Sequence, residues 1–157
     1  MNVRRMAKVG LVAGIYAVLT LIPPFSSLSY GPVQVRVSEA LTVLPFINPD
    51  YVWGLALGCI LGNLSSPIGA LDIFGGAAVT LLAAYLTSRA GSAWIAPLPP
   101  VVLNALLVGI YVSRFFGVPY VATVAYIAAG EVVACYVLGY PLLVYVLRNA
   151  RVRQILS

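Results

Sequence analysis

The stretch YVATVAYIAAGEVVACYVLGYPLLVYVL, residues Tyr120–Leu147, decides the fold class because it is apolar throughout and contains one charged residue, Glu131. A transmembrane helix needs about 20 mostly apolar residues, so this stretch predicts a spanning helix that begins near Pro119. A carboxylate is costly there, and no basic residue lies within one helical turn of it. We expect Glu131 to contact a ligand or to have a role in coupling. The alternative is a structural role, with the carboxyl group protonated or hydrogen-bonded to another helix.

The whole chain has this apolar character. Of its 157 residues, 62% are hydrophobic and 8% are charged, whereas ordinary globular domains have about 25% charged residues. We predict an all-α integral membrane protein, a compact bundle of six transmembrane helices that forms a single membrane domain over residues 1–157. The expected helices cover about 6–22, 37–46, 51–64, 72–88, 98–113 and 119–147.

The connection after the first helix has distinct features. Pro23 and Pro24 stop that helix, and the segment Phe25–Val35, rich in Ser, Gly and Pro, predicts a structured loop. The helix that follows, over 37–46, is short for a span. We therefore expect it to tilt, to start deep in the bilayer or to be extended by its flanks.

The basic residues indicate the orientation. Six spans place both termini on one side, and cytoplasmic segments carry an excess of Lys and Arg. If the termini are cytoplasmic, only Arg36 and Arg114 lie outside. The basic residues inside are Arg4, Arg5, Lys8, Arg89, Arg148, Arg151 and Arg153. We predict a multi-pass protein of the cell membrane. Its net charge of +5 is explained by orientation and by contact with anionic lipid, and we do not expect it to bind nucleic acid.

Charged residues also gather near the predicted outer surface. Arg36 and Glu39 are three residues apart, so they share a helix face and can form an ion pair. Asp72 stands at the predicted start of the fourth helix. All three are candidate ligand contacts. The structural alternative is that Ser38 and Asp72 cap their helices while Glu39 complements the helix dipole.

Uncharged polar residues extend this set. Asn63 and Asn104 are amides inside apolar helices, where they either contact a ligand or join helices by hydrogen bonds. Tyr30 and Tyr126 lie near the outer boundary, where tyrosine either stacks on a ligand or belongs to the interfacial belt.

The sequence offers little for catalysis or metal binding. It contains no histidine, and its two cysteines lie in apolar runs, which favours small buried side chains over a disulfide. We predict no catalytic residue, no metal site and no cofactor held by this chain.

Small residues predict two packing surfaces. Gly54, Gly58 and Gly62 repeat every four residues and predict a groove for packing inside this chain. The first helix has a second small surface that can meet a partner subunit. Its residues are Gly10, Ala13, Gly14 and Ala17.

Two blocks carry a family resemblance: SYGPVQVRVSEALTVLPFI (Ser29–Ile47) and GCILGNLSSPIGALDIFGG (Gly58–Gly76). They resemble the queuosine-precursor transporter family, QueT, which is similar to the substrate-binding S components of energy-coupling factor (ECF) transporters. The resemblance implies a six-helix S component that docks on a transmembrane coupling subunit carried by two ATPase subunits. It also implies docking through an AxxxA-like motif on the first helix, which Ala13 and Ala17 match. ATP would be used by the partners, since this chain has no Walker motif.

The resemblance implies a 7-deazaguanine cargo, namely preQ0, preQ1 or queuine. A carboxylate such as Glu131 or Glu39 can accept from the adjacent N1–H and N2–H donors of such a base. An amide or Arg36 can meet O6, and a second carboxylate can meet a cationic aminomethyl group. The alternatives are an S component for another vitamin or nucleobase, an intramembrane enzyme that uses carboxylates as acid and base, and a scaffold subunit.

Overall fold

The computed structural model describes residues 3–23, 25–31 and 33–157, and this part of the chain is helical with no β-strand. The all-α prediction is confirmed. The helices in chain order are α1 (Val3–Leu21), α2 (Phe25–Ser29), η1 (Val37–Phe46), α3 (Tyr51–Asn63), η2 (Leu71–Gly76), α4 (Ala77–Ser88), α5 (Leu98–Leu103), η3 (Asn104–Val108), α6 (Gly109–Phe116), α7 (Tyr120–Glu131), η4 (Val132–Gly139), α8 (Tyr140–Arg148) and α9 (Ala150–Leu156).

Several of these elements join into longer helices. Within the described residues, three continuous helices are long and apolar enough to cross a membrane: Leu71–Ser88, Leu98–Phe116 and Tyr120–Arg148. η1 and α3 are shorter apolar helices, and α1 has 19 residues, of which three among the first six are basic. The helix ends lie within three residues of the expected positions. Six spans and cytoplasmic termini stay predictions.

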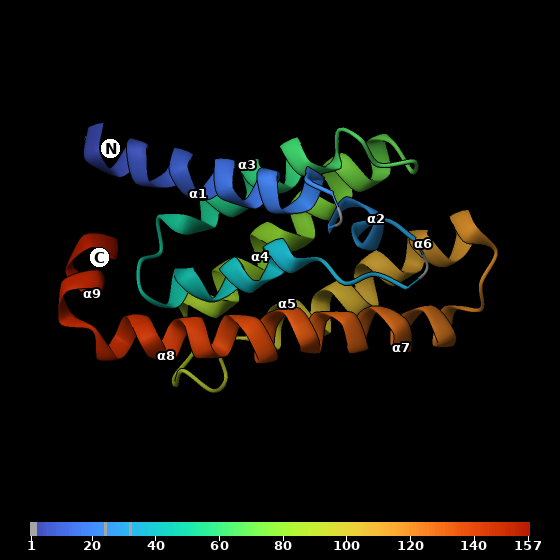
Figure 1. Cartoon of the computed structure of the whole chain (residues 1–157). Coiled ribbons are helices and arrows are strands. Elements are labelled where there is room, and N and C mark those ends of the chain that lie inside the picture. The colour runs from blue at the N-terminus through green and yellow to red at the C-terminus, as the bar shows by residue number, and fades with distance from the viewer. Residues whose placement is uncertain (1–2, 24, 32) are drawn as a thin grey trace.

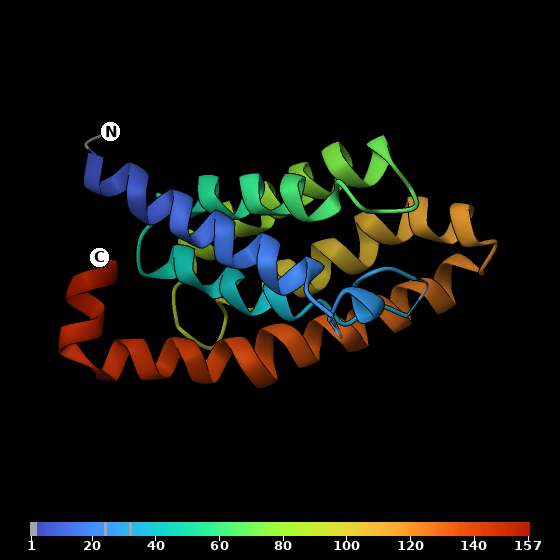
Figure 2. The ribbon, with the colours of Figure 1, turned by 45° about the horizontal axis from the view of Figure 1, so that its top comes forward.

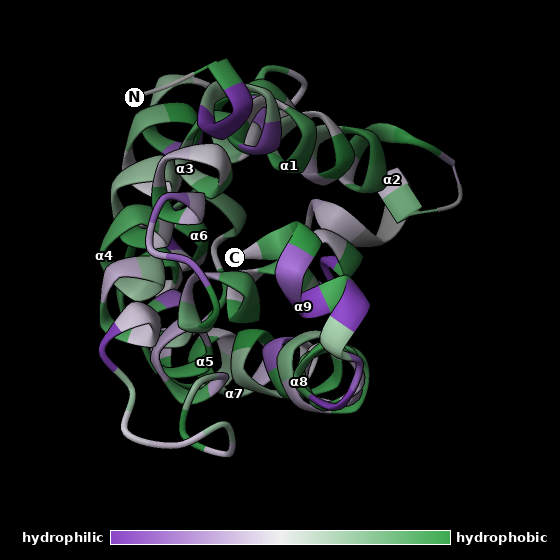
Figure 3. Ribbon diagram, turned by 90° about the vertical axis from the view of Figure 1, so that its left-hand side faces the viewer, coloured by the Kyte–Doolittle hydropathy of each residue, from purple (hydrophilic) through white to green (hydrophobic). Residues whose placement is uncertain are grey.

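The two described ends of the chain lie at the same end of the bundle (Figure 1). Figure 3 looks onto that end and shows hydrophilic residues on α9 and on the first turns of α1, while the helices behind them are largely hydrophobic. Lys8 Nζ donates to the backbone oxygen of Ser157 at 2.7 Å, which ties the two ends together. This arrangement is the one that an even number of crossings requires.

η1 is a 3₁₀ helix. Because a 3₁₀ helix is longer per residue than an α-helix, this winding supplies part of the length that a ten-residue helix needs to span the membrane. Ten residues advance about 20 Å at the 3₁₀ rise, compared with about 15 Å in an α-helix. Pro45 lies inside η1 and has no N–H to donate. Both ribbon views place η1 between α1 and the long C-terminal helix (Figures 1 and 2). Because its residues recur every three positions, Glu39 and Thr42 lie on one buried face.

The glycine repeat of α3 packs against α1. A Cβ on Gly54 would lie 2.8 Å from Val9 O, and one on Gly58 would lie 2.8 Å from Tyr16 Cβ. Real Cβ contacts are longer, so both positions require glycine for this close approach. The repeat therefore serves packing inside this chain.

A second close approach fixes the segment that leads into η1. A Cβ on Gly130 would lie 1.7 Å from Gln34 O, and one on Gly139 would lie 2.9 Å from Ala40 O. The segment and η1 thus lie directly on the C-terminal helix, where larger side chains would displace them. Gly130 immediately precedes Glu131, so this contact brings the loop to the candidate site.

Two short helices were not expected. α2 lies in the segment predicted as a loop, and α9 follows the last predicted span. Asn149 caps α9, since its Oδ1 accepts from Val152 N at 3.2 Å. Pro24, predicted to stop the first helix with Pro23, and Pro32 of the predicted loop lie outside the described residues.

Candidate functional site

Two buried carboxylates, Glu39 of η1 and Glu131 at the end of α7, line one small cavity in the bundle. Glu131 Oε1 accepts from Asn104 Nδ2 at 2.9 Å, and Glu131 Oε2 accepts from Cys135 Sγ at 3.4 Å. Tyr16 donates to Glu39 Oε1. Among the described residues, Glu39 Oε2 is buried without a hydrogen-bond partner. The site therefore has an acceptor available for a donor that this part of the chain does not supply.

We call this space the central cavity. Its free volume is about 10 Å³, which is about the minimum for one water molecule. A ligand the size of a nucleobase therefore enters only if the surrounding segments move apart. The lining residues are Gln34, Arg36, Glu39, Gly76, Thr80, Asn104, Val108, Ile127 and Glu131.

Irregular helix turns occur beside three of the predicted site residues. Asp72 lies in η2, Asn104 begins η3, and Glu131 directly precedes η4, and these three segments are π-helical. π-Helical turns are rare and are frequent at functional sites. In this chain they mark the points where polar side chains enter the bundle interior.

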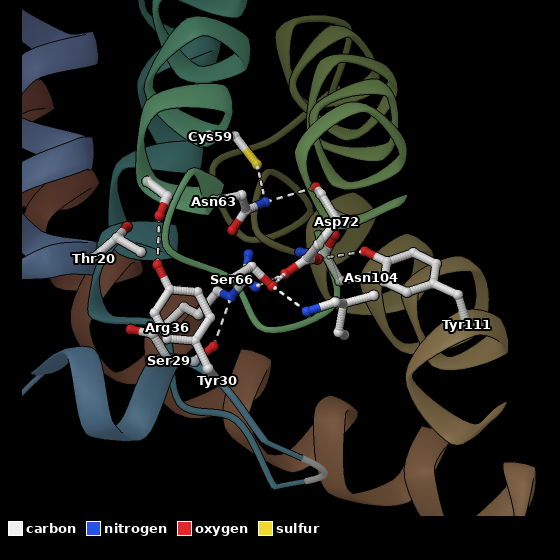
Figure 4. A network of polar contacts seen from close by, with 12 residues as sticks. Thr20, Ser29, Tyr30, Arg36, Cys59, Asn63, Ser66, Asp72, Asn104 and Tyr111 are labelled. Atoms are coloured by element: carbon white, nitrogen blue, oxygen red, sulfur yellow. Dashed lines mark hydrogen bonds and ion pairs between the residues drawn. The ribbon is translucent and has the colours of Figure 1, made fainter. Parts of the chain in front are cut away.

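A second polar cluster lies around Asp72, and Figure 4 shows it from close by. Arg36 Nη2 lies 3.2 Å from Asp72 Oδ2, and Ser66 Oγ donates to the same oxygen at 2.5 Å. Tyr111 OH donates to Asp72 Oδ1 at 2.8 Å. Arg36 Nε also donates to Ser29 O at 3.1 Å. Both oxygens of Asp72 are thus satisfied, and its charge is met by a guanidinium group.

The structure corrects two expectations about these charges. Arg36 and Glu39 do not form the predicted ion pair, because the guanidinium pairs with Asp72 instead. The capping alternatives are also wrong. Ala70 is the N-cap residue of η2, and Ser38 Oγ accepts from Thr20 Oγ1 at 2.8 Å instead of capping η1.

The remaining predicted contacts, Asn63, Tyr30 and Tyr126, are not among the residues that line the central cavity. Asn63 Nδ2 donates to Asp72 O at 2.8 Å, while Asn63 Oδ1 has no partner among the described residues. Tyr30 donates to Gly62 O, and its ring lies under Arg36 with 5.7 Å from Cζ to the ring centroid. Burial raises the pKa of the Tyr30 phenol, so it remains a donor at neutral pH. Tyr126 is 45% exposed and is not among the lining residues.

Comparison with known proteins identifies the family of the chain. Residues 6–148 match the sequence profile of the family described as QueT transporter. The chain belongs to the QueT transporter family. It is a multi-pass membrane protein, since three of its helices are long and apolar enough to span.

One curated relative shares part of the sequence. This relative is the queuosine precursor transporter QueT of Lactococcus lactis subsp. cremoris (strain MG1363). The two sequences are 41% identical over 58 residues, which are 37% of this chain. The match covers 34% of that relative, so the chain spans about a third of the length of the curated protein it matches. No solved structure matches the chain.

Several site residues were not predicted from the sequence. Gln34 and Thr80 line the central cavity, and Tyr16, Ser66 and Tyr111 hold the carboxylates in place. A weak signal was present for one of them. Tyr16 and Thr20 are polar residues four apart in an apolar helix, which places both on the face that contacts η1.

The small residues of α1 divide between two faces. Ala13 and Ala17 are buried, with Ala13 O 2.9 Å from a Cβ built on Gly58, whereas Gly10 and Gly14 are exposed with open space around them. Docking through α1 stays a prediction. If α1 docks as the structure presents it, Gly10 and Gly14 make the contact and the two alanines support it from inside.

Proposed function

We propose that this chain is the substrate-binding S component of an ECF-type importer. It captures a queuosine precursor, a 7-deazaguanine base, at the outer side of the cell membrane. A transmembrane coupling subunit and two ATPase subunits then drive uptake and use the ATP. The observation that carries this proposal is the central cavity, in which Glu39 Oε2 remains without a partner among the described residues, opposite the Glu131–Asn104 pair.

The cavity has the groups that such a base needs. The N1–H and N2–H of a guanine-like ring are adjacent donors, and a carboxylate accepts both in a bidentate arrangement. Glu39 Oε2 and the oxygens of Glu131 are the available acceptors. Asn104 and Gln34 are amides on the same lining, and either can donate to O6. Val108 and Ile127 provide apolar surface for the ring faces.

In this proposal two loops open and close the cavity. The segment before η1 contributes Gln34 and Arg36 to the lining, and Tyr30 ties it to the end of α3. The loop between α3 and η2 is held by Ser66, which donates to Asp72. In the proposed cycle these contacts break to admit the substrate and reform around it. The coupling subunit docks on the exposed face of α1 that contains Gly10 and Gly14.

The other functions considered have less support. A scaffold subunit would be favoured if the carboxylates were helix caps with no cavity between them, and Glu39 and Asp72 are not caps. Membership of a transporter family argues against an intramembrane enzyme. Another vitamin or nucleobase on the same scaffold remains the alternative cargo, and the binding experiment includes it.

The test is calorimetric binding of preQ0, preQ1, queuine and guanine to the purified chain in detergent. The expected result is submicromolar binding of at least one deazaguanine and much weaker binding of guanine. Glu131→Gln and Glu39→Gln should weaken binding, whereas Asp50→Asn should not. Asp50 is a matched control because it lies outside the cavity and pairs with Arg5, with 2.8 Å from Nε to Oδ2. The proposed cargo is wrong if no deazaguanine binds to the folded chain.

A further inference from the structure

The charges around the central cavity do not balance. Among the described residues, two carboxylates (Glu39 and Glu131) and one guanidinium (Arg36) line the cavity, and a third carboxylate, Asp72, lies next to the guanidinium outside the lining. The guanidinium is within ion-pair distance of Asp72, and no basic side chain of the described residues lies within 4.0 Å of Glu39 or Glu131. The side chains that donate hydrogen bonds to the two glutamates are neutral, namely Tyr16, Asn104 and Cys135.

Burial makes this imbalance important. Glu39 is 1% exposed and Glu131 is 6% exposed, so water does little to screen their mutual repulsion. Two carboxylates in one low-dielectric cavity are stabilised by a proton or by a cationic ligand. A neutral ligand supplies no such charge, so with it bound the repulsion would have to be relieved by a proton.

We propose that the central cavity selects, among queuosine precursors, those whose side chain carries a protonated amine. This inference rests on the proposed function, since it concerns the same cavity and the same class of bases. One glutamate accepts from the N1–H and N2–H edge of the base, and the other forms a charge-assisted hydrogen bond with the ammonium group. Arg36 does not repel the ammonium strongly, because Asp72 holds its guanidinium in an ion pair.

The selectivity has a structural basis in the two glutamates. They come from different helices, η1 and α7, so they approach the cavity from separate sides. Glu131 is already fixed by Asn104 and Cys135, while Glu39 is fixed through one oxygen only. We assign the ammonium to Glu39, whose Oε2 is buried and without a partner in the described part of the chain. The ring edge is assigned to Glu131.

The experiment compares three ligands that differ in one substituent. They are 7-aminomethyl-7-deazaguanine, which is cationic, and its 7-hydroxymethyl and 7-cyano counterparts, which are neutral. Calorimetry on the native chain should show the aminomethyl compound binding at least about 30-fold more tightly than either neutral compound, because a desolvated ion pair is lost in the comparison. The hydroxymethyl compound is the matched control for size.

The variants then show which of the two glutamates determines the selectivity. Glu39→Gln should bring the affinity ratio of aminomethyl to hydroxymethyl compound close to one, whereas Glu131→Gln should weaken both compounds and leave much of the ratio. The inference is overturned if the neutral compounds bind the native chain within about threefold of the cationic one, and the proposed function then survives. If neither the three compounds nor queuine binds the native chain, the proposed cargo and this inference both fail. The native-chain comparison stands even if a variant does not fold.

Discussion

The cluster around Asp72 and the cluster around Glu39 and Glu131 are both buried, but they differ in how fully their oxygens are satisfied. Asp72 accepts from Arg36, Ser66 and Tyr111, so both of its oxygens and its charge are matched. Glu39 has one oxygen without a partner in the described chain, and Arg36, which lines the same cavity, forms its ion pair with Asp72 instead. The difference separates a cluster that holds loops to helices from one that has capacity for a ligand.

Gly130→Ala should break both clusters and have the largest effect. Its added Cβ would lie 1.7 Å from Gln34 O, and the segment displaced by it delivers Arg36 and Glu39. We expect the free energy of unfolding to fall by more than about 3 kcal/mol, since a backbone atom cannot move aside cheaply. Denaturant unfolding followed by tryptophan fluorescence measures this.

The matched control for that change is Gly10→Ala. Gly10 has open space around it in α1, so alanine should change stability by about 1 kcal/mol or less, in the stabilising direction. Equal denaturation midpoints for the two variants would show that the contact between the segment and α7 is not required for folding.

Asp72→Asn should come next, because it removes the charge partner of buried Arg36. Breaking a buried ion pair from one side costs about 3 kcal/mol or more. The double variant Arg36→Gln with Asp72→Asn should be less destabilised than Asp72→Asn alone, since no uncompensated charge remains. Thermal melts of the four proteins in one detergent test this coupling. Additive effects of the two substitutions would contradict the assignment of a structural ion pair.

Glu39→Gln and Glu131→Gln should change stability by only about 1 kcal/mol, because neither substitution leaves a cation unpaired among the described residues. The affinity for the deazaguanine should nevertheless fall by at least about tenfold, as expected when a charged acceptor is lost. Melts and calorimetry on the same preparations provide both values. A large loss of stability without loss of affinity would reverse the roles that the two clusters have here.

The helices were largely predictable from the sequence, and the reason is hydropathy. The run Tyr120–Leu147 and the other apolar stretches set helix ends to within three residues of those observed. Helix type was less predictable. η1 has the expected limits, but a short apolar run does not distinguish its 3₁₀ winding from an α-helix. The π-helical turns in three helices were likewise invisible to a 3.6-residue period.

The membership of the site was also partly predictable. A carboxylate in an apolar run is conspicuous, so Glu39, Asp72 and Glu131 could be selected from the sequence alone. Their partners could not. The choice of Asp72 over Glu39 for Arg36 depends on how the start of η1 meets the start of η2, which are distant in the sequence. Neutral residues such as Gln34 and Thr80 give no such signal, and only the folded chain brings them to the central cavity.

Gly14→Leu should have the smallest effect on the stability of the bundle, and it tests whether substrate capture and coupling depend on different surfaces. Gly14 is exposed on α1 with nothing within 4 Å of an added Cβ, so stability should change by about 0.5 kcal/mol or less and deazaguanine affinity should be unchanged. If this face meets the coupling subunit, a leucine there prevents close backbone approach, and co-purification with the coupling subunit and the two ATPases should be lost.

The control for this prediction is Gly91→Leu, the same substitution at another exposed glycine with open space around it, in the connection after α4. It should leave both affinity and co-purification intact. Complex formation by Gly14→Leu at the native level would move the docking surface away from this face of α1. Loss of ligand affinity in Gly14→Leu would mean instead that α1 transmits strain to the cavity through Tyr16, which donates to Glu39 from the opposite face of the same helix. The outcome therefore decides whether the two faces of α1 act independently.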